Sequence, residues 1–322
     1  MGGMRAAGIE AFGRDVGMLE LTAPASPAPD EVVISMCAAG VGNWDEIVRS
    51  GGWDVGRRPP LALGVEAAGV VAAVGEGVTG LAPGDAVLTH PLPLRHQGAW
   101  AERLIAPAAL VAPKPAAVSW ETAAAFPVPA LTADQALDEV EPLPTGESLL
   151  VHGAGGVTGG LVVQLGVARG ARVIATASPA SAARVRGYGA AVVVDYRDHD
   201  WPDLVRGESP GRRAVRAAVN TVRRGAAGAL QAVADGGRLA TITGDPPPAE
   251  RGVTVTDVYV RPDGTRLAAL AGALGNGLLS LRVAATLPLE DAAAGLADAV
   301  AGRAAGAIVL VPRGSPAAAS RS

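Results

Sequence analysis

The sequence has one cysteine and four histidines in 322 residues. The single cysteine, Cys37, cannot form a disulfide bond within the chain. Because the histidines are scattered, no Cys/His cluster has the spacing of a zinc site. No uninterrupted apolar run reaches the roughly 18 residues that a membrane span requires, and residues 1–5 lack the basic and apolar regions of a signal peptide. We therefore expect a cytoplasmic protein without a metal and without a membrane partner.

The sequence is also poor in charged and aromatic side chains. Charged residues make up 18% of the chain, aromatic residues 3% and hydrophobic residues 49%, and the net charge is −4. This composition is typical of a globular protein, and its mild acidity argues against a nucleic-acid partner. A length of 322 residues predicts about two domains, because a domain averages roughly 150 residues.

The apolar runs predict two kinds of domain. In the first third of the chain they are short and separated by Gly and Pro, as in 31–36, 69–74 and 85–88, which predicts a small, mostly antiparallel β-domain. From about Ser119 strands alternate with Ala-rich helical segments, and this alternation predicts a doubly wound parallel sheet. The strands expected there are 148–152, 172–176, 191–194, 217–219, 238–242 and 253–260. Beyond Pro262 we expect a helix, a strand at 281–284, a helix opened by Glu290-Asp291 and a strand at 307–311.

A glycine cluster, "GAGGVTG" at residues 153–159, directly follows the first strand of the parallel sheet. Apolar residues recur at helical spacing over 157–168, so the order is strand, glycine turn and helix. In that arrangement free backbone N–H groups and the helix dipole meet a pyrophosphate. The third glycine position of G-x-G-x-x-G holds Thr158, and the alternative interpretation is a plain structural turn.

The residues after the glycines favour NADPH over NADH. An NAD site places Asp or Glu about 20 residues after the glycines, but no acidic residue occurs between Gly153 and Asp195. The second strand instead ends at Ser178, and Arg184 and Arg186 follow. A hydroxyl and a guanidinium can bind a 2′-phosphate. The alternative is that the arginines only solvate a helix.

Several short motifs make the sequence resemble the medium-chain dehydrogenase/reductase superfamily, in particular its zinc-independent, quinone oxidoreductase-like branch. Their order and spacing cover nearly the whole chain. The motifs are "GVEAAG" at 64–69, "GEGV" at 75–78, "PGD" at 83–85, "GAWAE" at 98–102, "LTA" at 131–133, the glycine cluster, "GYGA" at 187–190, "DY" at 195–196 and "GAIVL" at 306–310.

The resemblance implies an α/β fold of two domains. A GroES-like, mostly-β catalytic domain would comprise residues 1–121 and be completed by 262–322, and a Rossmann NADPH-binding domain would comprise 122–261. The nicotinamide and the substrate would meet in a cleft between these domains. The family also implies a homodimer.

The same resemblance implies that the chain works without zinc. Zinc alcohol dehydrogenases have a catalytic Cys and His at the positions that match Gly42 and Val65, and a four-cysteine loop near residues 90–100. None of these ligands is present. Without a Lewis acid to polarise a C–OH or C=O bond, reduction of an activated C=C bond or of a quinone becomes the natural chemistry.

Candidate catalytic residues are those that could border the implied cleft and donate hydrogen bonds or a proton to the reduced substrate. They are Asn43, Asp45, Trp53, His90 and His96. Each has a plainer interpretation: Asp45 would cap the following helix, His90 would end a strand, His96 would be a loop residue, and Trp53 would form a wall of the site. Asn43 is displaced from the family's usual V-N-P-x-D order.

Candidate cofactor-binding residues come from the glycine turn and from the resemblance. Thr132 matches a segment that approaches the nicotinamide carboxamide, and Tyr196 matches a residue near the adenosine 2′-phosphate. The family lysine expected around Ser181 is missing, and Ala307 replaces the lysine of the closing motif. The full set is Thr132, Gly153, Gly155, Gly156, Val157, Thr158, Ser178, Arg184, Tyr196 and Thr243.

The sequence leaves three functions open. The leading hypothesis is an NADPH-dependent reductase of quinones or α,β-unsaturated carbonyls. The second is a natural-product tailoring enzyme on the same fold, either a polyketide-type enoyl reductase or a non-redox cyclase. The third is an NADPH-binding sensor without turnover. We expect a small-molecule substrate that is planar or apolar, because Trp44, Trp53 and Trp100 lie in motifs that would border the cleft.

Overall fold

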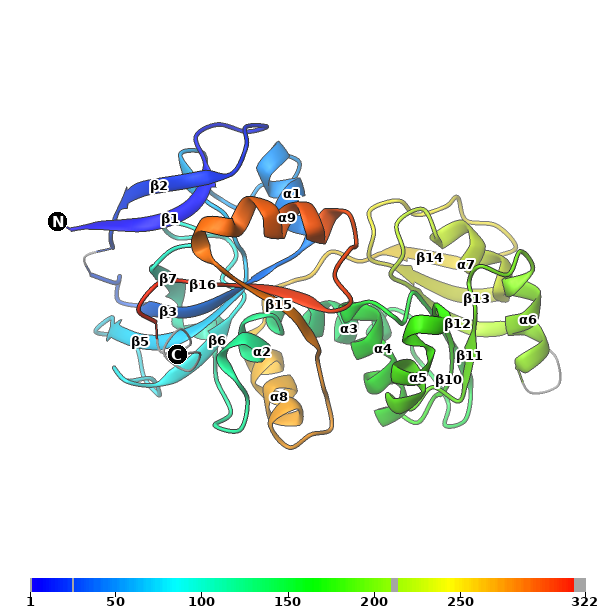
Figure 1. The fold of residues 1–322 in the computed structure, drawn as a ribbon. Helices are drawn as coiled ribbons and strands as arrows, with labels where there is room; N and C mark the ends of the chain where they lie inside the picture. Colours follow the sequence, from blue (N-terminus) through cyan, green and yellow to red (C-terminus); the bar gives the residue numbers. More distant parts are fainter. Residues whose placement is uncertain (1, 25, 210–213, 316–322) are drawn as a thin grey trace. The chain divides into compact units, whose positions relative to one another are not determined.

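The computed structural model describes residues 2–24, 26–209 and 214–315. The chain divides into unit 1, Met1–Val128 with Pro262–Ser322, and unit 2, Pro129–Arg261 (Figure 1). The sequence predicted the first boundary after residue 121, whereas unit 1 continues to Val128. Helix α2 (Trp120–Ala124) belongs to unit 1 because it packs on β3 and β5 of that unit. Helix α3 (Pro127–Asp138) starts in unit 1 and continues into unit 2.

Unit 1 has the GroES-like, mostly-β architecture that the sequence predicts. Its larger sheet has the order β15-β16-β3-β5-β6-β8 with β7 paired to β3, and a second sheet has the order β2-β1-β4. The pairs are antiparallel except β15 with β16. The strands are β1 (Gly3–Ile9), β2 (Gly17–Thr22), β3 (Glu31–Val41), β4 (Leu61–Ala62), β5 (Ala67–Val74), β6 (Ala86–Thr89), β7 (Arg103–Pro107), β8 (Val111–Pro113), β15 (Val283–Pro288) and β16 (Ala307–Val311). The remaining helices are α1 (Asn43–Ser50), η1 (Ala108–Leu110), α8 (Gly264–Gly275), η3 (Leu289–Asp291) and α9 (Ala292–Val300).

The strand register of unit 1 brings three distant segments together. Ala39 of β3 pairs with Ala67 of β5, and Ala67 pairs with Thr89 of β6. The residues just beyond these pairs, at the ends of β3 and β6 and before β5, therefore lie side by side. The sequence places Asp45 and His90 in the segments that leave β3 and β6 at this edge.

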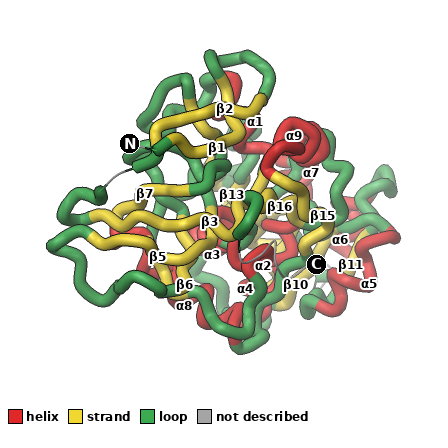
Figure 2. Tube along the Cα trace, turned by 60° about the vertical axis from the view of Figure 1, so that its left-hand side comes forward, coloured by secondary structure: helices red, strands yellow, loops and turns green. Residues whose placement is uncertain are grey.

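Unit 2 is a doubly wound domain, as predicted. Its six strands are all parallel in the order β11-β10-β9-β12-β13-β14, and the chain reverses direction across the sheet between β9 and β12. Ligands of such sheets bind outside the carboxyl ends of the strands at this point. Helices α5 and α6 lie beside β11 at one edge of this sheet (Figure 2). The elements are β9 (Ser148–His152), α4 (Val157–Ala168), β10 (Arg172–Thr176), α5 (Pro179–Gly187), β11 (Val192–Val194), α6 (Trp201–Glu208), β12 (Val215–Asn220), α7 (Ala226–Ala232), β13 (Val233–Thr241) and β14 (Thr254–Asp257).

Several predicted strands have different bounds in the structure. The strand expected at 238–242 is β13, which already begins at Val233. The strand expected at 253–260 is β14, which ends at Asp257. Val258 N–H still donates to the Thr241 carbonyl at 2.7 Å, and the chain then runs toward Pro262, which has no N–H to donate. The strand expected at 281–284 is β15, which extends to Pro288 because its partner β16 continues to Val311.

An ion-pair network holds α3 against the end of α4 in unit 2. The Arg169 guanidinium contacts the carboxylates of Asp134, Asp138 and Glu141. We expect Arg169→Met to lower the free energy of unfolding by about 1–2 kcal/mol, because three clustered carboxylates then lose their cation in a partly buried place. Arg206→Met removes an exposed pair with Asp203 and is the matched control, with an expected change under about 0.5 kcal/mol. Urea denaturation measures both, and equal losses would contradict the network's role.

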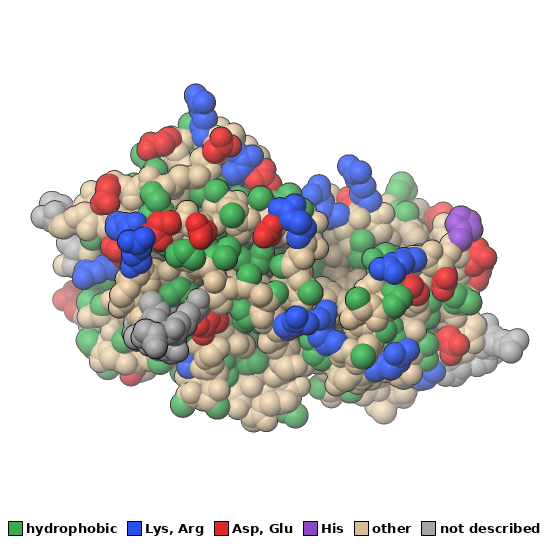
Figure 3. Space-filling view, viewed as in Figure 1, with side chains coloured by type: hydrophobic (Ala, Val, Ile, Leu, Met, Phe, Trp, Pro, Cys, Tyr) green, Lys and Arg blue, Asp and Glu red, His purple; other side chains and the backbone are tan. Residues whose placement is uncertain are grey.

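Charged side chains of both signs occur on the surface of the protein. On the face in Figure 3, basic and acidic side chains are scattered among apolar and polar ones, and neither sign forms one patch. Within the described ranges, no helix is long and apolar enough to cross a membrane.

Candidate functional site

The glycine turn joins β9 to α4 with the bounds that the sequence predicts. Gly153 has φ +92°, and a Cβ there would lie 2.5 Å from Thr221 Oγ1 and Val222 Cγ2, so this position requires glycine. Gly156 is the N-cap of α4 and is exposed, and a Cβ there would have only the Gly153 carbonyl oxygen, at 3.5 Å, as a neighbour. Val157 and Thr158 are in the first turn of α4, where the backbone N–H groups have no intrahelical partner, and this suits an anion.

Neighbouring elements hold the glycine turn from three sides. Thr176 Oγ1, at the end of β10, accepts a hydrogen bond from Gly153 N–H at 3.1 Å. Thr221 Oγ1, after β12, donates to the His152 carbonyl at 3.0 Å. Arg184 Nη2, from α5, donates to the Gly155 carbonyl at 2.7 Å. The turn is thus fixed in a single shape before any ligand binds.

The His152 side chain supports the glycine turn through Thr176. Its Nδ1 lies 2.7 Å from Thr176 Oγ1, and its ring stacks on Trp201 with centroids 4.4 Å apart and planes at 7°. Burial lowers the pKa of His152 to about 4, so the ring is neutral at physiological pH. This geometry assigns His152 to structural support.

Polar side chains gather at the carboxyl end of β10. Ser178 and Ser181 have their hydroxyl oxygens 3.1 Å apart, and a Cβ on Gly155 would lie 2.7 Å from Ser181 Oγ. Because β11 pairs in parallel with β10, Tyr196 follows its strand at the same edge, where its side chain is 47% exposed. The structure thus brings Ser178, Arg184 and Tyr196 of the predicted cofactor set to one edge, next to the glycine turn.

A second polar network lies at the carboxyl ends of β12 and β13. Asn220 Nδ2 donates to Thr241 Oγ1 at 2.9 Å, and the hydroxyls of Thr241 and Thr243 lie 2.9 Å apart. The Thr243 hydroxyl also donates to Asp245, whose other carboxylate oxygen accepts from Arg224 N–H at 2.5 Å. Of these residues the sequence argument named only Thr243. Polar residues at the ends of two successive parallel strands were the signal that would have found Asn220 and Asp245. The remaining predicted residue, Thr132, is buried in α3.

Among the catalytic candidates, Asp45 is buried in unit 1. Its Oδ2 accepts a hydrogen bond from Gly42 N–H at 2.9 Å, so it caps α1 from the third helical position, while Gly42 is the N-cap residue. Burial raises the pKa of Asp45 to about 7, opposed by hydrogen bonds from the backbone of Gly42 and Gly64. Burial also raises the pKa of Glu66 well above its usual value, opposed by the Val128 N–H at 2.8 Å and reinforced by the charge of Asp45.

His90 is buried beside the same segment. Its Nδ1 lies 2.6 Å from the Val65 carbonyl, and burial lowers its pKa to about 4 against the effect of that hydrogen bond. A neutral ring next to a carbonyl carries its proton on Nδ1 and donates it. In this structure neither His90 nor Asp45 reaches the surface.

The other three catalytic candidates retain exposed area. Asn43 is exposed at the start of α1, and Trp53 and His96 are half-buried in loops. Burial lowers the pKa of His96, and the nearby charge of Arg57 lowers it further.

The residues of unit 1 do not fit the catalytic zinc of zinc dehydrogenases. At the two matching positions, Gly42 packs against the Trp44 ring and Val65 is a buried apolar side chain. Across the described ranges, no group of three or more His, Cys, Asp or Glu side chains could hold a metal ion.

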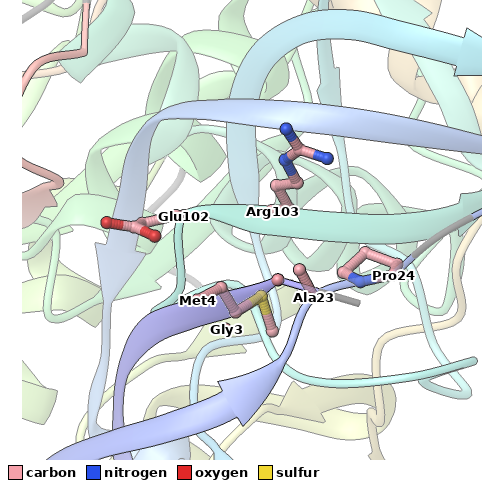
Figure 4. Close-up of a pocket in the computed structure, with 7 residues that line it drawn as sticks. Gly3, Met4, Ala23, Pro24, Glu102 and Arg103 are labelled. Carbon is pink, nitrogen blue, oxygen red and sulfur yellow. The ribbon is translucent and has the colours of Figure 1, made fainter.

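A cavity of about 350 Å³ opens on unit 1 near β1 and β7, lined by Gly2, Gly3, Met4, Ala23, Pro24, Glu102 and Arg103 (Figure 4). The Glu102 carboxylate in this cavity accepts a hydrogen bond from the backbone, from Arg5 N–H to Oε2 at 3.1 Å. None of the predicted site residues lines this cavity.

Comparison with known proteins agrees with this architecture. Residues 28–116 match the model of the alcohol dehydrogenase GroES-like domain, and residues 188–310 match that of the zinc-binding dehydrogenase family. A solved structure described as an NAD-dependent alcohol dehydrogenase is 31% identical with a TM-score of 0.86, covering 96% of this chain and 99% of that one. A mycobacterial protein solved in complex with NADPH is 30% identical with a TM-score of 0.82, covering 96% of this chain and 100% of that one.

Curated relatives are longer than this chain. A segment of the spectinabilin polyketide synthase protein NorB of Streptomyces orinoci is 41% identical over 167 residues, which is 52% of this chain and 7% of that protein. The chain spans about half the length of the mammalian VAT-1 homologs that it also matches.

Proposed function

The chain belongs to the medium-chain dehydrogenase/reductase superfamily, and from that membership we propose that it is an NADPH-dependent reductase that works without zinc. Its acceptor is a quinone or the activated C=C bond of an α,β-unsaturated carbonyl. One observation carries the proposal: the glycine turn opens α4 with free amides, and a hydroxyl pair and a guanidinium lie beside it where an NAD site would have a carboxylate.

Each part of the cofactor has residues suited to hold it. Backbone amides at Val157 and Thr158 would bind the pyrophosphate, with Gly153, Gly155 and Gly156 giving it room. Ser178, Arg184 and Tyr196 would bind the adenosine ribose and its 2′-phosphate, and Thr132 and Thr243 would orient the nicotinamide. When bound, the cofactor supplies the hydride. The neighbour solved with NADPH supports this choice of cofactor.

The substrate class follows from the chemistry that the described side chains can support. No described cluster of ligands could provide a Lewis acid to activate an alcohol, so an acceptor that is already electrophilic fits best. Asn43, Trp53 and His96 have exposed atoms for a planar or apolar substrate, and we propose them as substrate contacts. Similarity to part of a polyketide synthase favours a conjugated carbonyl among these acceptors.

Titration of the purified protein with NADPH and separately with NADH, followed by nicotinamide fluorescence, tests the proposal. A quinone and an enone are then added to the tighter complex. Preferential binding of NADPH and its oxidation by either acceptor are the expected results. Tight binding without oxidation would replace the reductase with a cyclase or a sensor, and no binding would overturn the proposal. Sedimentation of the same sample tests the expected homodimer.

Substitution of Arg184 tests the cofactor preference. Arg184→Ala should raise the Kd for NADPH about tenfold more than the Kd for NADH, because a charge-assisted hydrogen bond to a 2′-phosphate is worth about 1.5–3 kcal/mol. The Kd for NADH should also rise, by a smaller factor, because Arg184 donates a hydrogen bond to the Gly155 carbonyl of the glycine turn that both cofactors would use. The matched control is Arg186→Ala, an exposed arginine on the same helix. An equal rise for both cofactors would mean that Arg184 supports only the loop.

A further inference from the structure

Four polar side-chain atoms of unit 1 are buried without a hydrogen-bond partner among the described residues. Glu290 Oε2 is one of them, and the other three belong to the segments that leave β3 and β6: Trp44 Nε1, Asp45 Oδ1 and His90 Nε2. The side chains of Asp45 and His90 are 0% and 1% exposed. Folded proteins rarely leave a buried donor or acceptor unpaired, and such atoms indicate a bound water or ligand. The feature to be explained is that these three atoms belong to segments that the strand register of unit 1 places side by side.

Shared neighbours place the three side chains around two neighbouring backbone segments, at Gly42 and at Gly64-Val65. The Trp44 ring lies over Gly42, so that a Cβ on Gly42 would be 2.2 Å from Cε2, the ring carbon bonded to Nε1. Asp45 Oδ2 accepts from the same Gly42 at 2.9 Å, and the Gly64 backbone lies near enough to the Asp45 carboxyl to lower its pKa. His90 Nδ1 contacts the carbonyl of the next residue, Val65, at 2.6 Å.

The hydrogen-bonding roles of these atoms are complementary. Because His90 Nδ1–H donates to a carbonyl, its Nε2 is an acceptor, whereas Trp44 Nε1–H can only donate. Asp45 Oδ1 can donate when the carboxyl is protonated and accept when it is ionised. One water molecule can donate to Nε2, accept from Nε1 and make a third hydrogen bond with Oδ1 in either state. Three hydrogen bonds are typical of a buried water.

We propose that Trp44, Asp45 and His90 bind a single buried water molecule that links α1 to the segment after β6. A metal ion does not suit this place, because no described group of three ligating side chains exists and the indole N–H cannot coordinate one. The charge of Asp45 also acts on Glu66, and the Glu66 carboxylate accepts a hydrogen bond from Val128 N–H. The water site does not depend on the proposed reductase activity.

A crystal structure of the full chain at about 1.5 Å resolution tests the proposal directly. The expected result is an ordered water within about 3.2 Å of all three atoms. A direct contact between Asp45 and His90, or separate partners for the three atoms, would overturn it.

A nuclear magnetic resonance experiment provides an independent test in solution. The 15N shift of His90 Nε2 is compared between the natural protein and Asp45→Asn, a variant that can still accept the Gly42 N–H. If a shared water links the two side chains, the His90 Nε2 resonance shifts while the His152 resonances stay in place. An unchanged His90 resonance would overturn the proposal. Trp44→Phe, which removes only the N–H donor from this site, should shift the same resonance, and Trp53→Phe is the control that should not.

Discussion

Replacing Gly156 by alanine is expected to weaken NADPH binding about tenfold to hundredfold while the protein stays folded. The new Cβ would have only the Gly153 carbonyl oxygen as a neighbour, at 3.5 Å, and the backbone at Gly156 does not have positive φ. The methyl group would therefore project into the space in front of the first turn of α4. It would separate a phosphate from the amides there, and one lost charge-assisted hydrogen bond costs about 1.5–3 kcal/mol.

Gly156 is a cleaner position for this test than the other two glycines of the turn. Alanine at Gly153 would be strained by its positive φ, and alanine at Gly155 would collide with Ser181, so either could act through folding. Fluorescence titration gives the Kd, and the thermal unfolding midpoint shows whether the fold is kept. Gly187→Ala is the control, because a Cβ there meets no atom within 4 Å. If Gly156→Ala binds NADPH normally, the cofactor does not lie on the start of α4.

The fold of unit 2 was predictable from local pattern because most of its strands contain a short apolar run next to turn residues. The strands at 148–152 and 172–176 and the helix at 157–168 have the predicted bounds. The errors fall where tertiary partners decide the ends. β14 stops at Asp257 as the chain approaches Pro262, and β15 extends to Pro288 because β16 offers a partner there. Hydrophobic period alone carries no information about such partners.

The candidate site was predictable in part. Glycine spacing and the hydroxyl at Ser178 marked the cofactor edge, because both sit at fixed positions after consecutive strands. The environment of Asp45 and His90 was not predictable, since their burial depends on the pairing of β3, β5 and β6. Asn220 and Asp245 were missed because their hydrogen bonds with Thr241 and with Arg224 N–H each join positions 21 residues apart in the chain, which the parallel sheet brings together.

Asp45→Asn and His90→Asn are expected to change the pH dependence of stability in opposite directions. The folded pKa of Asp45 is raised from 3.8 to about 7, and that of Glu66 is raised well above 4.5. Their contribution to stability is full at low pH and is lost as the pH rises. The folded pKa values of His90 and His152 are lowered from 6.5 to about 4. Their contribution is full above pH 6.5 and is lost as the pH falls.

Between about pH 4.5 and 6.5 the contributions of Asp45 and His90 cancel. Unfolding releases one proton from the Asp45 carboxyl and binds one at His90, so together they give a slope near zero. Asp45→Asn abolishes the proton that Asp45 releases on unfolding, so the free energy of unfolding of this variant should rise with pH by about 1.4 kcal/mol per pH unit relative to the natural protein. His90→Asn abolishes the proton that His90 binds on unfolding, so the free energy of unfolding of that variant should fall with pH by the same amount. Urea denaturation at several pH values measures both slopes. A loss of packing energy that is the same at every pH lowers the stability of a variant but does not change its slope. Parallel slopes for the two variants would show that at least one of these side chains does not have the protonation state that its burial implies.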